Sequence, residues 1–291
     1  MTAAIVVPTS IGAAFAFAGS TSLKHVSAGH GSGRETPSTH RLLEFIRSTV
    51  VHRLWLMAIA LDAAGVTLQM IALHLGAMAL VQPLLTLGLV FALVFRRWHD
   101  REQVSRRQIV AGVLLTLTLG AFLVATFPAS ATAQRIDRMP AAAVTAACLV
   151  IAGGCVAAAT RRRAHAAVLL GIALGVIYAG TAALLKSVTG VIARSPWHVF
   201  ISWSFYAVLL LGAIGLLLNQ IAFRAGPLSA SLPAATAVDP VLSILIGVVA
   251  YDEQLPRGLR HLVLLVVLLV ALCLAAAYLA RGPQQRGAKA S

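Results

Sequence analysis

Long apolar stretches separated by short polar connections make up most of this 291-residue chain. A bilayer core about 30 Å thick needs roughly 20 apolar residues in an α-helix. Nine stretches of about that length carry few charges: 3–23, 54–74, 76–95, 108–127, 139–160, 164–189, 197–223, 227–250 and 259–280. The pattern predicts an all-α polytopic membrane protein with nine transmembrane helices.

The composition excludes a water-soluble globular domain. The chain is 59% hydrophobic and 11% charged, with a mean hydropathy of +0.88, whereas soluble domains are about half apolar and about a quarter charged. The first stretch could be a cleaved signal peptide. However, it lacks a basic start and is longer than a typical signal-peptide core, which favours a first transmembrane helix.

The net charge of +14 is distributed unevenly between the two sides of the predicted bundle. With nine spans, 17 of the 23 lysines and arginines share a side with the C-terminal tail, residues 282–291. The positive-inside rule therefore predicts a cytoplasmic C-terminus and an N-terminus outside. No basic stripe with interleaved aromatic residues occurs, so the charge does not indicate nucleic-acid binding. Only three of the basic residues are lysine, which indicates a GC-rich bacterial genome and hence the plasma (inner) membrane.

The longest connection ends in an amphipathic segment, residues 38–53. Leu42, Leu43, Ile46 and Val50 fall on one helical face there. Such a face predicts a helix that lies flat on the cytoplasmic membrane surface.

The chain resembles itself when it is shifted by 150 residues. The positions that match at this offset are Ala63, Gly65, Leu68, Ile71, Ala72, Gly76, Pro83 and Thr86. In the predicted topology the matching helices run in opposite directions, so the two halves are inverted. Residues 1–127 would hold helices 1–4, residues 128–160 a connecting helix 5, and residues 161–281 helices 6–9. Inverted repeats of this kind build many secondary transporters, which bind substrate near the membrane midplane.

Two carboxylates lie inside predicted spans. Asp62 is in the second stretch and Asp239 is halfway along the eighth. A carboxylate inside a bilayer costs several kcal/mol unless it is paired, hydrated or protonated, which makes each a candidate for binding or coupling. Pro233 and Pro240 flank Asp239 and predict a kink or a short unwound stretch. Together with Pro83 they are candidate hinges.

Other polar residues could line the same cavity. Those in or beside the spans are Gln69, Asn219, Gln220, Thr236, Lys24 and Lys186, with Ser243 on the face of Asp239 and Tyr178 and Thr181 in the sixth span. Lys24 and Lys186 occupy pseudo-symmetric places in the two halves. In an alternative interpretation Asp62 pairs with a lysine or the backbone for packing, the lysines snorkel to the surface, and the prolines only bend helices.

No motif indicates an enzyme or a cofactor. The HExxH, GxSxG and Walker patterns are missing, and the three cysteines lack the spacing of a zinc site or a disulfide framework. Gly171 and Gly175 form a GxxxG pair, which is typical of close helix packing.

Three segments resemble the drug/metabolite transporter superfamily with its EamA-like repeat. They are ALVQPLLT at 79–86, SASLP at 229–233 and the acidic helix end Tyr251-Asp252-Glu253. The likeness covers the whole membrane region. Nine helices with an outside N-terminus, and the segments 19–24, 65–72 and 81–84, are most similar to the NIPA-type magnesium transporter branch.

The resemblance implies a permease that moves a small solute by alternating access. If the solute is magnesium, Asp62 and Asp239 would be its ligands. That branch tends to carry an acidic residue and an asparagine in the second helix, where Val66 and Gln69 stand here. The predicted outer side also carries six basic residues and three acidic ones, and this net positive charge would not attract a dication.

The sequence therefore predicts a secondary transporter whose substrate is open. A magnesium transporter is one alternative, and a membrane scaffold or regulatory subunit that transports nothing is the other. The sequence does not decide whether transport is coupled to a proton or cation, in which direction it runs, or whether the protein forms a homodimer.

Overall fold

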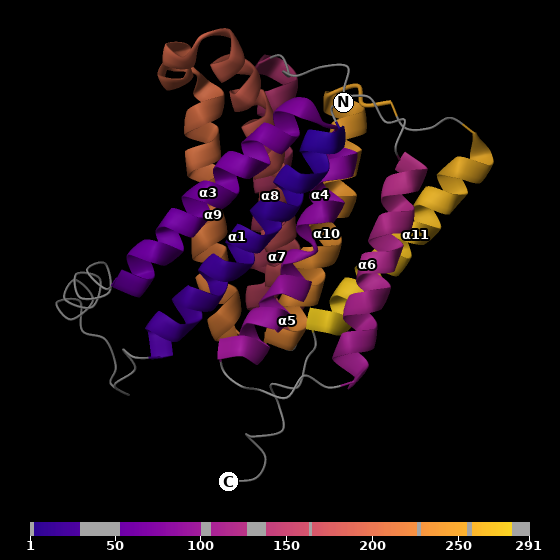
Figure 1. Ribbon diagram of the computed structural model, residues 1–291. Coiled ribbons are helices and arrows are strands. Elements are labelled where there is room, and N and C mark those ends of the chain that lie inside the picture. The colour runs from indigo at the N-terminus through magenta and orange to yellow at the C-terminus, as the bar shows by residue number, and fades with distance from the viewer. Residues whose placement is uncertain are drawn as a thin grey trace, which may run out of the picture.

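The computed structural model describes residues 3–29, 53–99, 106–126, 138–162, 165–225, 228–254 and 258–280. Within these ranges the chain is almost entirely helical, and the long helices lie side by side in one bundle (Figure 1). The all-α prediction is confirmed. The amphipathic segment 38–53 and the tail 282–291 fall outside the described residues, except for Arg53.

The helices follow the predicted apolar stretches closely. They are α1 (Ala3–Gly29), α3 (Arg53–Leu75), α4 (Met78–Leu85), α5 (Gly88–His99), α6 (Arg106–Thr126), α7 (Arg138–Arg161), α8 (Ala166–Arg194), α9 (Trp203–Ala225), α10 (Leu228–Ala250) and α11 (Leu259–Ala280). A short 3₁₀ helix, η2 (Pro196–Ile201), precedes α9.

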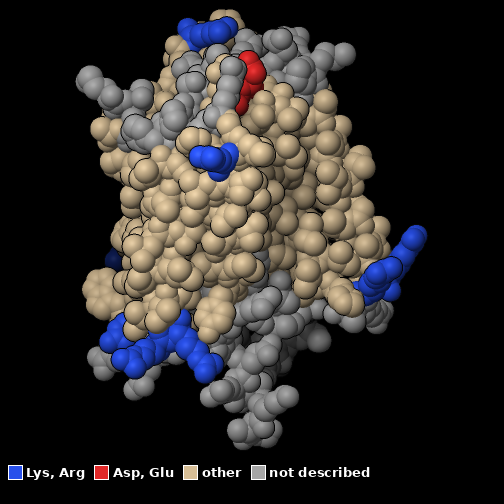
Figure 2. Space-filling view, turned by 90° about the vertical axis from the view of Figure 1, so that its right-hand side faces the viewer, with Lys and Arg blue, Asp and Glu red and all other residues tan. Residues whose placement is uncertain are grey.

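The surface of the bundle suits a bilayer. In the described residues, seven helical segments are long and apolar enough to cross a membrane, and two shorter apolar helices span Trp203–Asn219 and Ala234–Ala250. Large apolar side chains on these helices, such as Leu217 and Val249, are exposed. Lysine and arginine side chains gather near the two ends of the molecule, with a broad uncharged band between them (Figure 2). These are the features of a polytopic membrane protein.

Helix α8 is the centre of the bundle. It packs against α3, α7, α9, α10 and η2, and 72% of its apolar segment is buried, against 17–44% in the other six spanning segments. Close packing depends on its glycines. A Cβ on Gly175 would lie 2.8 Å from the carbonyl oxygen of Ala235 in α10, and Gly171 meets the backbone of Ser231 in the same way. The prediction that this GxxxG pair packs helices is confirmed.

The third predicted span, 76–95, is divided by a turn into α4 and α5, and Met78–Phe95 as a whole is still long and apolar enough to cross a membrane. The turn is at Thr86 and Leu87, and Thr86 keeps φ and ψ in the right-handed helical region. The Thr86 hydroxyl donates to the carbonyl oxygen of Pro83 at 2.6 Å, and the backbone amides of both Thr86 and Leu87 make i→i+3 bonds. The break is thus stabilised by bonds that replace the normal helical pattern.

The expected unwound stretch at Pro233 and Pro240 is not observed. Helix α10 is continuous from Leu228 to Ala250. A proline removes one backbone donor but does not by itself force the chain out of a helix. The Ser243 hydroxyl, three residues after Pro240, donates to the Asp239 carboxylate.

The predicted span 197–223 also starts too early. Residues Pro196–Ile201 form η2, and the helix begins only at Trp203. The backbone amide of Ser202 bonds Val199, closing the 3₁₀ turn before α9 starts. The apolar residues of η2 extended the hydropathy pattern without being part of the helix.

Candidate functional site

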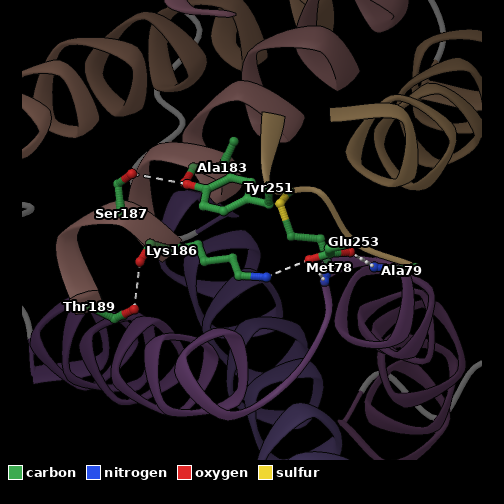
Figure 3. Close-up of polar contacts among 8 residues, drawn as sticks. All are labelled: Met78, Ala79, Ala183, Lys186, Ser187, Thr189, Tyr251 and Glu253. Atoms are coloured by element: carbon green, nitrogen blue, oxygen red, sulfur yellow. Dashed lines mark hydrogen bonds and ion pairs between the residues drawn. The ribbon is translucent and has the colours of Figure 1, made fainter. Parts of the chain in front are cut away.

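A buried ion pair joins Lys186 of α8 to Glu253, which lies just beyond α10 (Figure 3). Neither side chain reaches solvent, since Lys186 is 0% and Glu253 is 3% exposed. The Lys186 ammonium also lies over the ring of Tyr251, 4.8 Å from its centre. Two opposite charges taken out of water must be compensated by each other and by further hydrogen bonds.

Glu253 supplies those further bonds by capping α4. Its carboxylate accepts hydrogen bonds from the backbone amides of Met78, at 2.7 Å, and Ala79, at 3.3 Å. The N-cap of α4 is Ala77, which has no side-chain acceptor, and residues Met78–Leu84 are buried. The first amides of a helix need an acceptor and favour a negative charge. The acceptor here comes from the other half of the chain.

The chain reaches this position through a tight turn after α10. Asp252 has a φ of 50°, in the left-handed region where aspartate is tolerated. The amide of Glu253 then donates to the carbonyl of Gly247 at 3.0 Å. A Cβ on Gly247 would lie 2.5 Å from the Glu253 carboxylate. Only glycine at 247 leaves room for the carboxylate over the helix end.

Tyr251 covers the ion pair on the α8 side. Its hydroxyl donates to the carbonyl oxygen of Ala183 and shares a 3.1 Å hydrogen bond with the Ser187 hydroxyl. Thr189 donates to the carbonyl oxygen of Lys186 at 2.7 Å. This end of α8 is therefore tied to the end of α10 and the start of α4 by a closed polar network, which we call the end latch (Lys186, Ser187, Tyr251, Glu253 and the α4 start).

The end latch corrects two sequence interpretations. Snorkelling of Lys186 to the surface is wrong, because its ammonium is fully buried. Glu253, which the sequence analysis places at a helix end on the predicted outer side, is buried too. The signal for its role is the start of α4, because a buried helix whose N-cap is Ala77 rather than Ser, Thr, Asp or Asn requires an acceptor from elsewhere.

A second polar region lies midway along the helices. Asp239 of α10 is half-buried and accepts a 3.2 Å hydrogen bond from Ser243, one turn later. Asp62 of α3 is also half-buried. The charges of both carboxylates act on one group, the hydroxyl of Tyr178 in α8. We call Asp62, Tyr178 and Asp239 the mid-bundle cluster.

Tyr178 is unusual for its helix. Its side chain is 40% exposed, although its neighbours Ile177 and Ala179 are fully buried. Gly215 of α9 makes room for its ring, since a Cβ there would lie 3.3 Å from the ring edge. The central helix thus carries one partly exposed tyrosine within electrostatic range of two carboxylates.

The other predicted site residues are spread over the bundle. Gln69 of α3, Asn219 of α9 and Thr236 of α10 are half-buried, while the side chains of Gln220 and Lys24 lie outside the described part. Lys186, grouped with the carboxylates at first, is instead paired with Glu253 in the end latch. Pro83 and Pro240 are buried. Among the described residues, no three His, Cys, Asp or Glu side chains gather as a metal site.

Comparison with known proteins gives one relative. The chain is similar to an uncharacterized protein of Corynebacterium glutamicum, with 26% identity over 204 residues, which cover 69% of this chain and 70% of that protein. No protein-family model matches the chain. No solved structure matches it either.

Proposed function

We propose that this protein is a secondary transporter that moves a small cationic solute across the membrane by alternating access. The observation that carries the proposal is the mid-bundle cluster. Carboxylates of α3 and α10, far apart in the chain, are both within electrostatic range of Tyr178 on the central helix. A carboxylate inside a membrane segment is costly unless it is paired, hydrated or protonated, which makes each one a candidate ligand for a cation.

The two proposed halves are related in their element bounds. Helices α3 and α9 are both 23 residues long and start at Arg53 and Trp203, while α4 and α10 start at Met78 and Leu228. Both pairs are offset by the 150 residues at which the sequence repeats. Helix α1 packs on α3, α4 and α5, as α8 packs on α9 and α10. This parallel supports an inverted repeat of the drug/metabolite transporter kind, in which the site lies between the halves.

The end latch supplies the second part of the cycle. It connects Glu253, from the second half, to the start of α4, in the first half. In the proposed topology this end faces outside, so the latch closes the outer entrance while the mid-bundle cluster is reached from the cytoplasm. Opening outward requires Glu253 to leave the α4 amides. Two discrete arrangements of this contact would give the two states of the transporter.

Magnesium is a second candidate within the same class, favoured by the two carboxylates that face Tyr178. With two carboxylates and no third acidic or histidine partner among the described residues, the ion would keep most of its water, as magnesium commonly does. An organic cation would need only charge neutralisation. The two candidates are distinguished by which solute, magnesium or an organic cation, the protein transports.

The test is flux into proteoliposomes holding the purified protein. Magnesium uptake is measured first, with and without a pH gradient, and a panel of organic cations follows. Each is run beside the Asp239→Asn variant, with Asp239→Glu, which keeps the carboxylate, as the matched control. Flux should be lost in the first variant and kept in the second.

The outcomes separate the alternatives. Magnesium flux that depends on Asp239 would identify the solute as a divalent cation. Flux of organic cations without magnesium flux would identify the solute as an organic cation. Full flux in Asp239→Asn would remove Asp239 from the mechanism. A folded protein that moves none of the solutes, and whose Asp62 and Asp239 positions are dry, would favour a scaffold or regulatory subunit.

A further inference from the structure

Two apolar grooves flank the start of α6. One, of about 360 Å³, lies between α5 and α6 and is lined by Leu93, Val94, Arg97 and Val113 among others. The other, of about 600 Å³, lies between α6 and α11 and is lined by Arg106, Arg107, Val110, Leu114, Leu274 and Tyr278 among others. Both grooves open on the outside of the bundle, and neither belongs to the mid-bundle cluster or the end latch.

Each groove has its basic residues at the same end of the bundle. Arg97 lies in the last turn of α5, Arg106 and Arg107 open α6, and Tyr278 lies near the end of α11. The walls beyond them are apolar and strongly exposed: Val110 is 63% and Leu274 is 66% exposed. An apolar trough with arginines at its mouth matches an acyl chain attached to an acidic headgroup.

The grooves are not simply gaps in the protein core. Helices α6 and α11 lie side by side at the edge of the bundle (Figure 1). Their inner faces form a packed cluster around Leu115, Leu119 and Leu272. The grooves lie at the outer edge of this cluster, and two of its members, Ala111 and Ala275, line the larger one.

We propose that a two-chain anionic phospholipid straddles the start of α6, with one acyl chain in each groove and its phosphate held by Arg97, Arg106 and Arg107. Arginine is suited to this role because its planar guanidinium binds phosphate oxygens in pairs. The tyrosine at the mouth of the larger groove occupies the place where aromatic side chains meet headgroups.

A second copy of the chain is a poorer occupant of this face. A two-fold interface would place the same patch of both copies together, and the arginines of the two copies would face one another across it. Like charges brought together without counter-charge destabilise such a contact. An anionic headgroup neutralises the same arginines.

The test is lipid retention by the full-length protein purified in detergent, read by native mass spectrometry. Phosphatidylglycerol is titrated against phosphatidylcholine with identical acyl chains. The groove variant is Arg106→Gln with Arg107→Gln. The matched control is Arg161→Gln with Arg162→Gln, which removes the same charge from exposed positions at the end of α7, outside both grooves.

The wild type and the control should retain phosphatidylglycerol over phosphatidylcholine, and the groove variant should lose affinity on the order of tenfold. Leu114→Trp, which fills the larger groove without changing charge, should reduce retention as well, and it remains informative if the arginine variant fails to fold. Equal retention in the groove variant and the control would overturn the proposal. So would a dimer, seen in the same spectra, that Leu114→Trp dissociates.

Discussion

The end latch and the mid-bundle cluster both place charged groups inside the bundle, but they do so in opposite ways. In the latch, Lys186 and Glu253 are excluded from solvent and meet each other, two helix amides and a tyrosine face. In the cluster, Asp62 and Asp239 are half-buried, and the Tyr178 side chain, on which both charges act, is 40% exposed.

The difference separates a structural charge from a functional one. A buried pair whose hydrogen bonds are all made has no capacity left for a solute, so it can hold the fold or close an entrance. Half-buried carboxylates inside a membrane segment are candidates for binding a solute. Glu253 is more deeply buried than Asp239, so burial alone would favour Glu253 as the solute-binding carboxylate. The contacts of the two residues favour Asp239.

The largest expected effect comes from breaking the latch. Glu253→Ala leaves the Lys186 ammonium buried without a partner and the α4 amides without an acceptor. The free energy of unfolding should fall by about 3–5 kcal/mol. Denaturation followed by circular dichroism in detergent measures it, with Arg161→Gln at the exposed end of α7 as the control.

A double variant shows whether the lost charge balance is the cause. Lys186→Met with Glu253→Gln keeps an oxygen acceptor for Met78 but removes both charges. It should recover most of the loss. If the double variant is as unstable as Glu253→Ala, the pair is not what stabilises this end.

The next effect tests the space under Glu253. Gly247→Ala places a methyl group against the carboxylate and should cost about 1–3 kcal/mol of stability. Gly212→Ala in α9 is the contrasting control, because nothing lies within 4 Å of its Cβ position. An alanine there should stabilise the helix by up to about 1 kcal/mol. Thermal melts that shift in the same direction for both variants would contradict the packing described here.

A smaller effect is expected from the hydroxyl that closes the latch. Tyr251→Phe removes the hydrogen bonds to Ser187 and Ala183 and should cost about 0.5–1.5 kcal/mol. Tyr206→Phe, whose exposed hydroxyl donates to the Phe200 carbonyl at 2.7 Å, should cost less. Chemical denaturation of the two variants side by side gives the comparison, and equal losses would mean that burial adds nothing.

The smallest effect on stability belongs to the mid-bundle cluster. Asp239→Asn keeps an oxygen that can accept from Ser243, so the free energy of unfolding should change by less than about 1 kcal/mol. Flux should nevertheless be abolished. A large loss of stability with flux retained would make Asp239 a packing residue and erase the contrast with the latch.

The helices could be predicted from the sequence because the pattern of apolar residues that indicates them is local. Apolar length located each spanning stretch, and Gly171 and Gly175 marked a close helix crossing. The hydropathy pattern failed to predict helix breaks and buried charges, because these depend on hydrogen bonds between distant or competing groups. Pro83 lies before a break at Thr86 and Leu87, while Pro240 lies in a continuous helix.

For the same reason, sequence analysis could predict only part of the candidate site. Asp62 and Asp239 are conspicuous as charges inside apolar spans, and both are within electrostatic range of Tyr178. Glu253 is inconspicuous because it follows a helix end, where acidic residues are usually solvated. Its burial depends on the turn at Asp252 and on an uncapped helix that begins 175 residues earlier in the chain.

The most direct test of the central claim is the water accessibility of Asp239. The three native cysteines, Cys148, Cys155 and Cys273, are replaced by alanine, and single cysteines are introduced at Asp239, at buried Ser187 and at lipid-facing Leu217. A charged, water-soluble thiol reagent is then applied to membranes. The account predicts rapid labelling at 239 and little at 187 or 217. Labelling at 239 as slow as at 217 would show that the mid-bundle cluster is dry and would contradict a transport site there.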